Sequence, residues 1–448
     1  MTSPTTGAVP SVRRVAVLLG LLVALTIVGS SAVAVALPDV AADLSLDTAG
    51  TAWVLACFSL SFSVTTAVFG RLADARGLRL PLRVGVTLFT LGSLLAGAAW
   101  SFPILIAGRL VQGAGAGAVP VLALGIVAAR FDGAARSQAL GGLTAVVSIV
   151  SGSGPLIGGA ITELVSWRAV LALPAIALLI AEPVARLAPA RPVGGPGGGR
   201  ARRPGVDVRG ALLVSVTVTA VTLLLQSPAT GLGLRASGAA GAAAAIGVAA
   251  VMRHVRRRPE GFLPAAVVGD PIFRRCAFGG LSLLAAYLGM LLAVPLLLAA
   301  EHGWRPLQIG LALLPAAALG AVTASTVGAL VARLGRARLA SGLAVGSAAG
   351  LLVAAAAPGS PLLLVSGMAL VVAGFAGGQV ALLDGVAAVV GEQHRGVALG
   401  VFNLVFFSGG AVGAAAVGGL AGLVTLPGAL ACLAVLPAAG AVAIRGTR

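Results

Sequence analysis

Charged residues are scarce in this sequence and make up only 10% of its 448 positions. A soluble domain carries roughly 25% charged residues, so the composition excludes an ordinary water-soluble fold. Hydrophobic residues form 58% of the chain, and its mean hydropathy is +1.07. Long apolar stretches recur along the whole length, each close to the roughly 20 residues that a helix needs to cross a bilayer. The sequence therefore predicts an all-α integral membrane protein.

Lysine is absent, because all 30 basic residues are arginine, and only 13 residues are acidic. In a soluble protein, a net charge of +17 would suggest a nucleic-acid partner. In a membrane protein it has another explanation, since short cytoplasmic loops collect basic residues. If the N-terminus is cytoplasmic, 26 of the 30 arginines fall in cytoplasmic segments, the exceptions being Arg109, Arg168, Arg235 and Arg305. We expect a multi-pass protein of the inner (plasma) membrane with both termini cytoplasmic, the lipid bilayer as a partner and no nucleic acid.

Cysteine is also rare, and Cys57, Cys276 and Cys432 stand singly in apolar stretches. This spacing fits neither a disulfide framework nor a zinc site. The three histidines fall in predicted loops without metal-ligand spacing, and neither an HExxH motif nor a P-loop is present. We therefore expect no metal, no catalytic residues and no cofactor, which disfavours a membrane enzyme and an ATP-driven pump.

Fourteen apolar stretches are long enough to be transmembrane helices. The first of them exceeds the roughly 7 to 15 apolar residues of a signal peptide, so we interpret it as a membrane helix. The predicted spans are 15–37, 50–70, 82–100, 103–128, 139–163, 168–187, 209–227, 236–252, 275–299, 307–332, 338–357, 361–388, 397–422 and 426–444.

An internal repeat relates the two ends of the chain. A shift of 259 residues places Gly154 on Gly413, and a shift of 258 residues places Gly77 on Gly335. Equivalent halves of six helices, with a substrate site at their interface, are typical of transporters built from parallel repeats. The predicted parts are a cytoplasmic tail (1–14), an N-terminal six-helix bundle (15–188), a cytoplasmic Pro/Gly/Arg linker (189–208), two inserted helices (209–252), a cytoplasmic loop (253–274) and a C-terminal six-helix bundle with a short tail (275–448).

The predicted loop after the second span contains Gly70, Asp74, Arg76, Gly77 and Arg79. Its order of glycine, aspartate and then basic-glycine-basic residues resembles the signature loop of the major facilitator superfamily. The resemblance implies two six-helix bundles and a cytoplasmic latch at this loop that opens as the halves rock.

Arg109 stands inside the fourth predicted span, with Gln112 one turn later on the same face. A buried arginine in a membrane helix needs polar partners because its insertion costs roughly 2.5 to 3.5 kcal/mol. The segment resembles the fourth-helix motif of the superfamily, in which this arginine is linked to proton movement. A purely structural arginine that binds backbone carbonyls is the alternative.

The fifth predicted span contains Gly154, Pro155, Gly158 and Gly159. Glycines allow close helix packing, and a proline allows a local bend. The spacing resembles the antiporter motif of the superfamily and favours export by exchange over uptake. Together with Ser166-Trp167-Arg168 and Ala36-Leu37-Pro38, it is similar to the fourteen-helix drug:proton antiporter branch.

The chain departs from this branch in the first span, where Gly29 and Ala34 replace the usual aspartate and asparagine. The carboxylate that couples to the proton is therefore not the usual one. Asp384, in the twelfth predicted span, is the favoured candidate, on the expectation that it is buried among apolar residues. An ordinary charged residue near the cytoplasmic end of this span is the alternative. Glu163 and Glu182 are the other acidic candidates, and we expect them to be interfacial.

The sequence thus predicts a secondary active transporter, not an enzyme, that exports hydrophobic or amphipathic small molecules, such as drugs or antibiotics. The proton motive force replaces a cofactor, and the expected partners are the small-molecule substrate and protons. We expect a monomer that works by alternating access. The alternative is a facilitator of the same fold that carries a polar metabolite, although such a path would be expected to contain more than one tyrosine. A non-transporting membrane protein is the alternative from another class.

Overall fold

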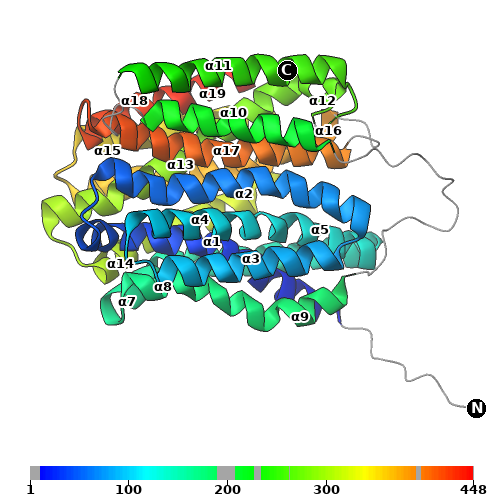
Figure 1. The fold of residues 1–448 in the computed structure, drawn as a ribbon, viewed down its shortest axis with the longest axis horizontal. Helices are drawn as coiled ribbons and strands as arrows, with labels where there is room; N and C mark the ends of the chain where they lie inside the picture. The colour runs from blue at the N-terminus through cyan, green and yellow to red at the C-terminus, as the bar shows by residue number, and fades with distance from the viewer. Residues whose placement is uncertain (1–10, 189–206, 227–233, 262, 390–394, 447–448) are drawn as a thin grey trace, which may run out of the picture.

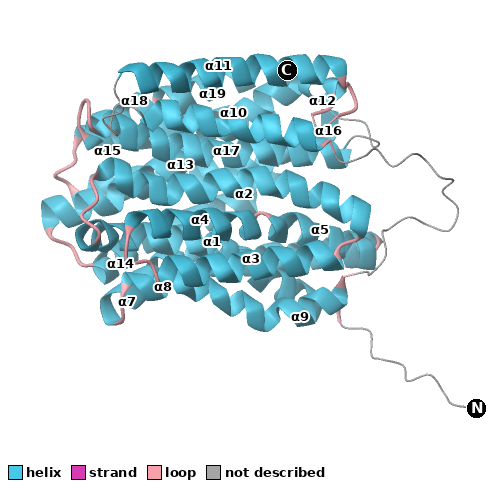
Figure 2. Ribbon diagram, viewed as in Figure 1, coloured by secondary structure: helices cyan, strands magenta, loops and turns pink. Residues whose placement is uncertain are grey.

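The computed structural model describes residues 11–188, 207–226, 234–261, 263–389 and 395–446, and the side chains of a few helical residues, including Asp74, are not described. Every regular element of this part of the chain is a helix, and the helices run side by side (Figures 1 and 2). The first helices are α1 (Val12–Asp43), α2 (Thr48–Arg76), α3 (Arg79–Gly97), α4 (Phe102–Ala116), α5 (Ala118–Arg130), α6 (Gly133–Gly152), α7 (Gly154–Leu164), α8 (Trp167–Ala172), the 3₁₀ turn η1 (Leu173–Ile176) and α9 (Ala177–Leu187). The later helices are α10 (Val208–Gln226), α11 (Leu234–Arg257), α12 (Ala265–Gly269), α13 (Pro271–His302), α14 (Pro306–Leu334), α15 (Arg336–Ala356), α16 (Pro361–Val389), α17 (Arg395–Ala421), α18 (Leu426–Leu433) and α19 (Val435–Arg445).

Most of these helices have the length and composition of membrane spans. Twelve helical segments qualify in the described residues, and the bent pair of α6 and α7 makes a thirteenth. The predicted span 209–227 falls on α10, whose apolar part Leu212–Leu225 is shorter, so its crossing of the bilayer remains a prediction. Large apolar side chains cover the outside, where Ile149, Leu179 and Leu362 are 74%, 76% and 74% exposed. Such a surface suits lipid rather than water, and the prediction of an all-α multi-pass membrane protein is confirmed.

Several predicted spans are broken in ways that the apolar pattern did not reveal. The predicted helix 139–163 begins earlier, at Gly133, and breaks at Ser153, where α6 and α7 meet at 41°. Pro155, in the first turn of α7, lacks an N–H and cannot continue the hydrogen bonds of α6. The last predicted span, 426–444, likewise divides into α18 and α19 around Ala434.

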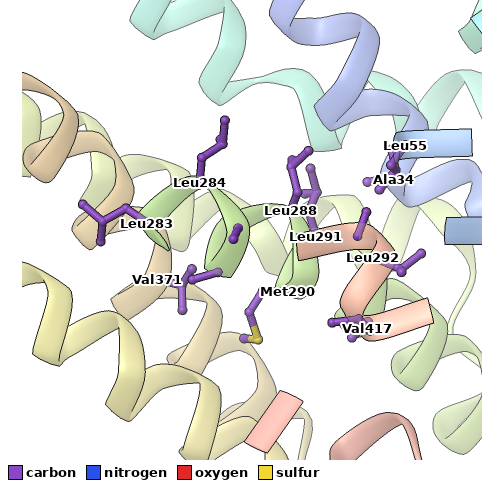
Figure 3. Packing of buried hydrophobic residues seen from close by; sticks show 14 of the residues in the cluster. Ala34, Leu55, Leu283, Leu284, Leu288, Met290, Leu291, Leu292, Val371 and Val417 are labelled. Carbon is purple, nitrogen blue, oxygen red and sulfur yellow. The ribbon is translucent and has the colours of Figure 1, made fainter. Parts of the chain in front are cut away.

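Helix α13 is the central element of the core. Most of its apolar residues are buried, and it packs on α16 and α17 of its own half and on α1 of the other half. Figure 3 shows Leu288 and Leu291 of α13 on the side toward Ala34 and Leu55, with Val417 below them in the view. Two further helix pairs join the halves, because α17 packs along α2 and α14 packs along α7.

Gly77 and Gly335, which the repeat places together, share one backbone conformation. Each follows a long helix and has a φ of 80°, which favours glycine. Basic residues follow both glycines, because α3 begins at Arg79 and α15 begins at Arg336. The two halves therefore make the same turn at these positions.

Arginines mark one end of the bundle, called here the basic end. Arg76, Arg186, Arg257, Arg333 and Arg445 all lie in the last turn of a helix there. Figure 1 shows α5, α9 and α12 at this end, while α7 and α18 reach the opposite end. The predicted tail 1–14 and linker 189–208 lie largely outside the described residues.

Candidate functional site

Arg109 of α4 is fully buried and is held by acceptors from three helices. Its Nε donates a hydrogen bond to the Val54 carbonyl at 2.9 Å, and its Nη1 donates to the Gly29 carbonyl at 3.2 Å. Nη1 also donates to Oε1 of Gln112 at 2.5 Å, and the guanidinium carbon lies 4.4 Å from the centre of the Phe58 ring. The carbonyl dipoles and the ring face partly compensate a charge that would otherwise be costly at this depth. The expected polar partners of Arg109 are therefore present.

Gln112 extends this network to two more helices. Its Nε2 donates to Oγ of Ser93 on α3 at 2.9 Å and to the Leu171 carbonyl on α8 at 3.4 Å. Gln112 and Ser93 are both 0% exposed. We call Arg109, Gln112 and Ser93 the Arg109 cluster. The cluster connects five helices of the N-terminal half, although Nη2 of Arg109 has no hydrogen-bond partner among the described residues.

A backbone carbonyl contacts Arg109 where the related branch carries an aspartate. Gly29 has no side chain to offer, and its carbonyl oxygen accepts the hydrogen bond from Nη1. A Cβ atom at this position would lie 4.0 Å from Nε2 of Gln112 and 3.4 Å from Pro174, which are ordinary contacts. The position thus faces the Arg109 cluster and has room for a small side chain.

The segment predicted as the latch loop lies at the basic end, but Gly70 to Arg76 belong to the last turns of α2, so the turn itself is only Gly77 and Leu78. Arg71, directly after Gly70, donates from Nη2 to the Gly261 carbonyl at 3.0 Å, in the segment between α11 and α12. Arg79 donates from Nε to the Ala185 carbonyl on α9 at 3.1 Å. Arg76 is exposed, and Gly70 packs beside Val121 of α5. The side chain of Asp74 is not among those that the structure describes. The loop therefore holds its own half together and reaches the inserted segment through Arg71, while its action as a latch remains a prediction.

Asp384 is not buried, so the premise that favoured it is wrong. Its side chain is 59% exposed, and its Oδ2 lies 2.6 Å from Nη2 and 2.9 Å from Nε of Arg336. An arginine at the turn after Gly335 pairs with it because α15 and α16 are neighbours at the basic end. Glu182 is in a similar position, since Arg83 and Arg186 both bind it. These two carboxylates are ion-pair partners at helix ends.

The glycines of α7 bring its backbone against two other helices. Gly154 and Gly158 lie against Ser31 and Ala32 of α1. Gly159 lies against Pro306 at the start of α14, so closely that a Cβ atom would overlap the Pro306 carbonyl oxygen. The predicted close packing and bend are confirmed, and α7 is a contact between the two halves.

A second glycine, Gly310 of α14, completes this contact by lying against the Pro155 carbonyl. Nearby, the Glu163 carboxylate accepts a hydrogen bond from the Leu307 backbone N–H at 3.2 Å and lies 3.8 Å from Nη1 of Arg305. Glu163 therefore joins the two halves, while its place at the membrane interface remains a prediction. The α7–α14 contact joins the two halves at the end opposite to the basic end.

A cavity of about 260 Å³ lies between the halves. Helices α1 and α6 and the start of α7 line it from one side, and α13, α14 and α16 line it from the other. Its wall is mostly aliphatic, with a stacked pair of Tyr287 and Phe375 whose ring centres are 4.5 Å apart. Gln379 of α16 also lines it. Such an apolar space with a few polar groups is a typical small-molecule site.

Some polar contacts could not be read from the sequence. Trp167 donates from Nε1 to Oδ2 of Asp43 at 3.1 Å, and Nη1 of Arg168 lies 2.8 Å from the same oxygen. His254 and Asp207 form a second pair at 2.7 Å, near the basic end. Ser93 was also missed, because a serine in an apolar helix carries no signal of its partner. No group of three or more His, Cys, Asp or Glu residues that could hold a metal occurs in the described part of the chain.

Comparison with known proteins agrees with this architecture. The chain is 33% identical over 405 residues to the cephamycin export protein CmcT of Amycolatopsis lactamdurans. This alignment covers 87% of this chain and 81% of that protein. It is 29% identical over 389 residues to the multidrug resistance protein Stp of Mycobacterium tuberculosis, covering 86% and 71%.

Solved structures share the fold at low sequence identity. A bacterial homologue of the lysosomal transporter Spinster, in an inward-facing and unoccupied conformation, has a TM-score of 0.67 and 16% identity, covering 98% of this chain and 95% of that one. An auto-inhibited peptide transporter of the POT family has a TM-score of 0.68 and 15% identity, covering 96% of each chain. The sequence profile of the Major Facilitator Superfamily matches residues 19–414. The chain belongs to the major facilitator superfamily.

Proposed function

We propose that this transporter exports hydrophobic or amphipathic small molecules, such as drugs or antibiotics, in exchange for protons. The observation that carries the proposal is the apolar cavity between the halves, which helices of both halves line. The relatives named as a cephamycin exporter and a multidrug resistance protein support it. The small share of polar groups in the wall argues against the polar-metabolite alternative.

We propose that the transporter works by alternating access, and the way in which the halves meet supports it. The α7–α14 contact lies next to the cavity, since Pro155 is in both, and its glycines bring the two helix backbones into direct contact. Opening the bundle at this contact while the basic end closes would expose the cavity to the other side of the membrane. The antiporter-like residues of α7, from Gly154 to Gly159, lie at this moving contact.

The Arg109 cluster is the proposed centre of proton coupling. It is buried, it connects five helices, and its hydrogen bonds involve α1, the helix that also lines the cavity. A change in its hydrogen bonds would therefore move the cavity wall. The resemblance to the fourth-helix motif supports this role for Arg109 and Gln112.

The remaining parts of the proposal concern the membrane. The arginine distribution supports an inner-membrane protein with both termini and the basic end cytoplasmic. The order of helices supports six helices, two inserted helices and six further helices, with α10 and α11 as the insert. We further propose that the chain acts as a monomer without a cofactor and is not an enzyme.

The test is drug susceptibility of an efflux-deficient bacterium that expresses the chain, across antibiotics and dyes, with and without an uncoupler. The matched variant is the double mutant Asp74→Asn, Arg109→Ala at equal surface level. Resistance that disappears in the variant and on uncoupling supports the proposal. Unchanged susceptibility to every compound, with the protein well expressed, contradicts it and favours the metabolite transporter.

A further inference from the structure

Four polar side chains of the cavity wall have no hydrogen-bond partner among the described residues. Thr144 and Ser151 come from α6, Tyr287 from α13 and Gln379 from α16. The Ser151 hydroxyl is buried without a hydrogen bond, and no hydrogen bond joins the other three side chains to any described residue. The buried Ser151 hydroxyl costs free energy while it has no partner, and the other three side chains, which are partly or fully exposed, are free to bind the polar atoms of a ligand in the cavity.

Two of these groups lie beside an aromatic surface. Tyr287 stacks on Phe375 with an angle of 7° between the rings, and Gln379 follows Phe375 by one helical turn. Phe375 and Tyr287 therefore offer flat apolar area, while the hydroxyl and the amide offer hydrogen bonds at its edge. This combination fits a molecule with an aromatic body and a carbonyl, hydroxyl or amide group.

The described wall of the cavity contains no ionisable carboxylate, arginine or histidine. A charged ligand would lose its hydration there without gaining an ionic partner, which is costly in a region of low dielectric constant. The nearest acidic group along α16 is Asp384, one turn beyond Val380, and Arg336 already binds it.

The charged side chain next to the wall helix α1 is a cation, Arg109. Arg109 binds the carbonyl of Gly29, which lies between the wall residues Ile27 and Ser31 on α1. No carboxylate pairs with Arg109 among the described residues, because Gly29 stands where the related branch has an aspartate. The uncompensated guanidinium therefore raises the electrostatic potential of the cavity and repels cations.

We infer that the cavity selects uncharged amphipathic molecules and discriminates against lipophilic cations, with Thr144, Ser151, Tyr287 and Gln379 as the specificity-determining residues. The inference rests on the proposed function, since it describes the substrate class of the same cavity. The hydrogen-bonding groups bind carbonyl, phosphoryl or hydroxyl groups of the molecule, and its apolar part lies on Phe375 and the aliphatic wall.

The experiment compares two probes of similar shape, neutral triphenylphosphine oxide and the tetraphenylphosphonium cation. Binding to the full chain in lipid nanodiscs is measured by equilibrium dialysis, with empty nanodiscs subtracted. We expect triphenylphosphine oxide to bind at least about tenfold more tightly than tetraphenylphosphonium. Equal or tighter binding of the cation overturns the inference.

Variants of Gln379 test which property of the cavity wall causes the selectivity for the neutral probe. Gln379→Leu is expected to weaken the binding of triphenylphosphine oxide about three- to tenfold, as the loss of one hydrogen bond predicts. Gln379→Glu, which has nearly the same shape, adds a negative charge to the wall and is expected to allow tetraphenylphosphonium to bind at pH 8. Asn403→Leu, which removes an amide from α17 outside the cavity wall, is the control and is expected to bind both probes as the parent does. If Gln379→Glu gains no cation binding, the charge argument is wrong.

Failure of the proposed function gives a different result from failure of this inference. A chain that confers resistance and binds the cation as well as the neutral probe keeps the proposed function and loses the inference. A chain that confers no resistance while it binds the neutral probe selectively keeps the selectivity and loses export.

Discussion

Nη1 of Arg109 lies 2.5 Å from Oε1 of Gln112, one turn further along α4, and both side chains are completely buried. This contact joins the only two strongly polar side chains of α4 into one unit. Because Gln112 uses its amide nitrogen to bind Ser93, the two residues link α1 and α2 to α3 through hydrogen bonds. The predictions below begin with this unit.

Replacing Arg109 by lysine tests whether its geometry or only its charge matters. One ammonium group cannot reach the Val54 carbonyl, the Gly29 carbonyl and Gln112 together, whereas the guanidinium does so. We expect Arg109→Lys to lower the transport rate by about tenfold or more, since a hydrogen bond to a charged group contributes about 1.5–3 kcal/mol. Dye efflux from cells with matched surface levels measures it. Arg186→Lys, at an exposed ion pair, is the control, and equal rates in both variants would count against the role of the cluster.

Installing the missing carboxylate tests the structure around Gly29. Gly29→Asp places an acid beside Arg109 and Gln112, in space that a Cβ atom can enter. Because the guanidinium lacks a carboxylate partner, we expect the melting temperature of the purified protein to rise by about 2 to 4 °C, which corresponds to roughly 1 kcal/mol. Gly29→Asn, of the same shape but neutral, should give no such rise. A lower melting temperature for Gly29→Asp than for Gly29→Asn would contradict the described surroundings.

Alanine at Gly159 or Gly310 should open the end opposite to the basic end. The added methyl group overlaps the Pro306 carbonyl in one case and the Pro155 carbonyl in the other. Overpacking of this kind costs about 1–3 kcal/mol, so the closed state should lose at least about fivefold in population. The measurement is the labelling rate of Ala317→Cys in the cavity wall, with a membrane-impermeant maleimide applied from outside, after Cys57, Cys276 and Cys432 are replaced. Gly328→Ala, on the same helix and without a close neighbour, is the control. Unchanged labelling in both variants would show that this contact is not the gate.

Glu163 should assist the same closure. Its carboxylate binds the Leu307 N–H and is only 27% exposed, so we expect Glu163→Ala to raise the labelling rate about threefold, as the loss of one hydrogen bond predicts. Glu163→Gln keeps an acceptor for this N–H and should remain close to the parent. Equal effects of the two substitutions would point to the charge pair with Arg305 instead.

Asp384→Asn should leave proton-dependent transport within about twofold of the parent. The residue is 59% exposed and forms an ion pair with Arg336, and exposed pairs contribute about 0–1 kcal/mol. Dye efflux before and after addition of an uncoupler measures the effect. If uncoupler-sensitive efflux disappears while substrate binding is kept, Asp384 carries the proton after all.

The sequence was sufficient for the class of protein because lipid solvent demands long apolar helices, and these are visible in composition alone. It also identified Arg109, since an arginine inside such a stretch requires partners. It could not identify the partners: two are backbone carbonyls, and Ser93 lies on another helix. The burial of Asp384 was misjudged because position along a helix does not tell which end residues of neighbouring helices are basic. The break at Ser153 was expected only as a bend, since the angle depends on how α7 packs against α1 and α14.

The most direct test of proton-coupled export is transport in proteoliposomes that contain the purified chain and a pH-sensitive dye. With an outward-directed gradient of the neutral probe triphenylphosphine oxide and no imposed pH gradient, substrate efflux should drive protons inward and acidify the lumen. The account predicts this acidification for the parent chain and its loss in Arg109→Ala. Substrate movement of equal rate without any proton movement would contradict it.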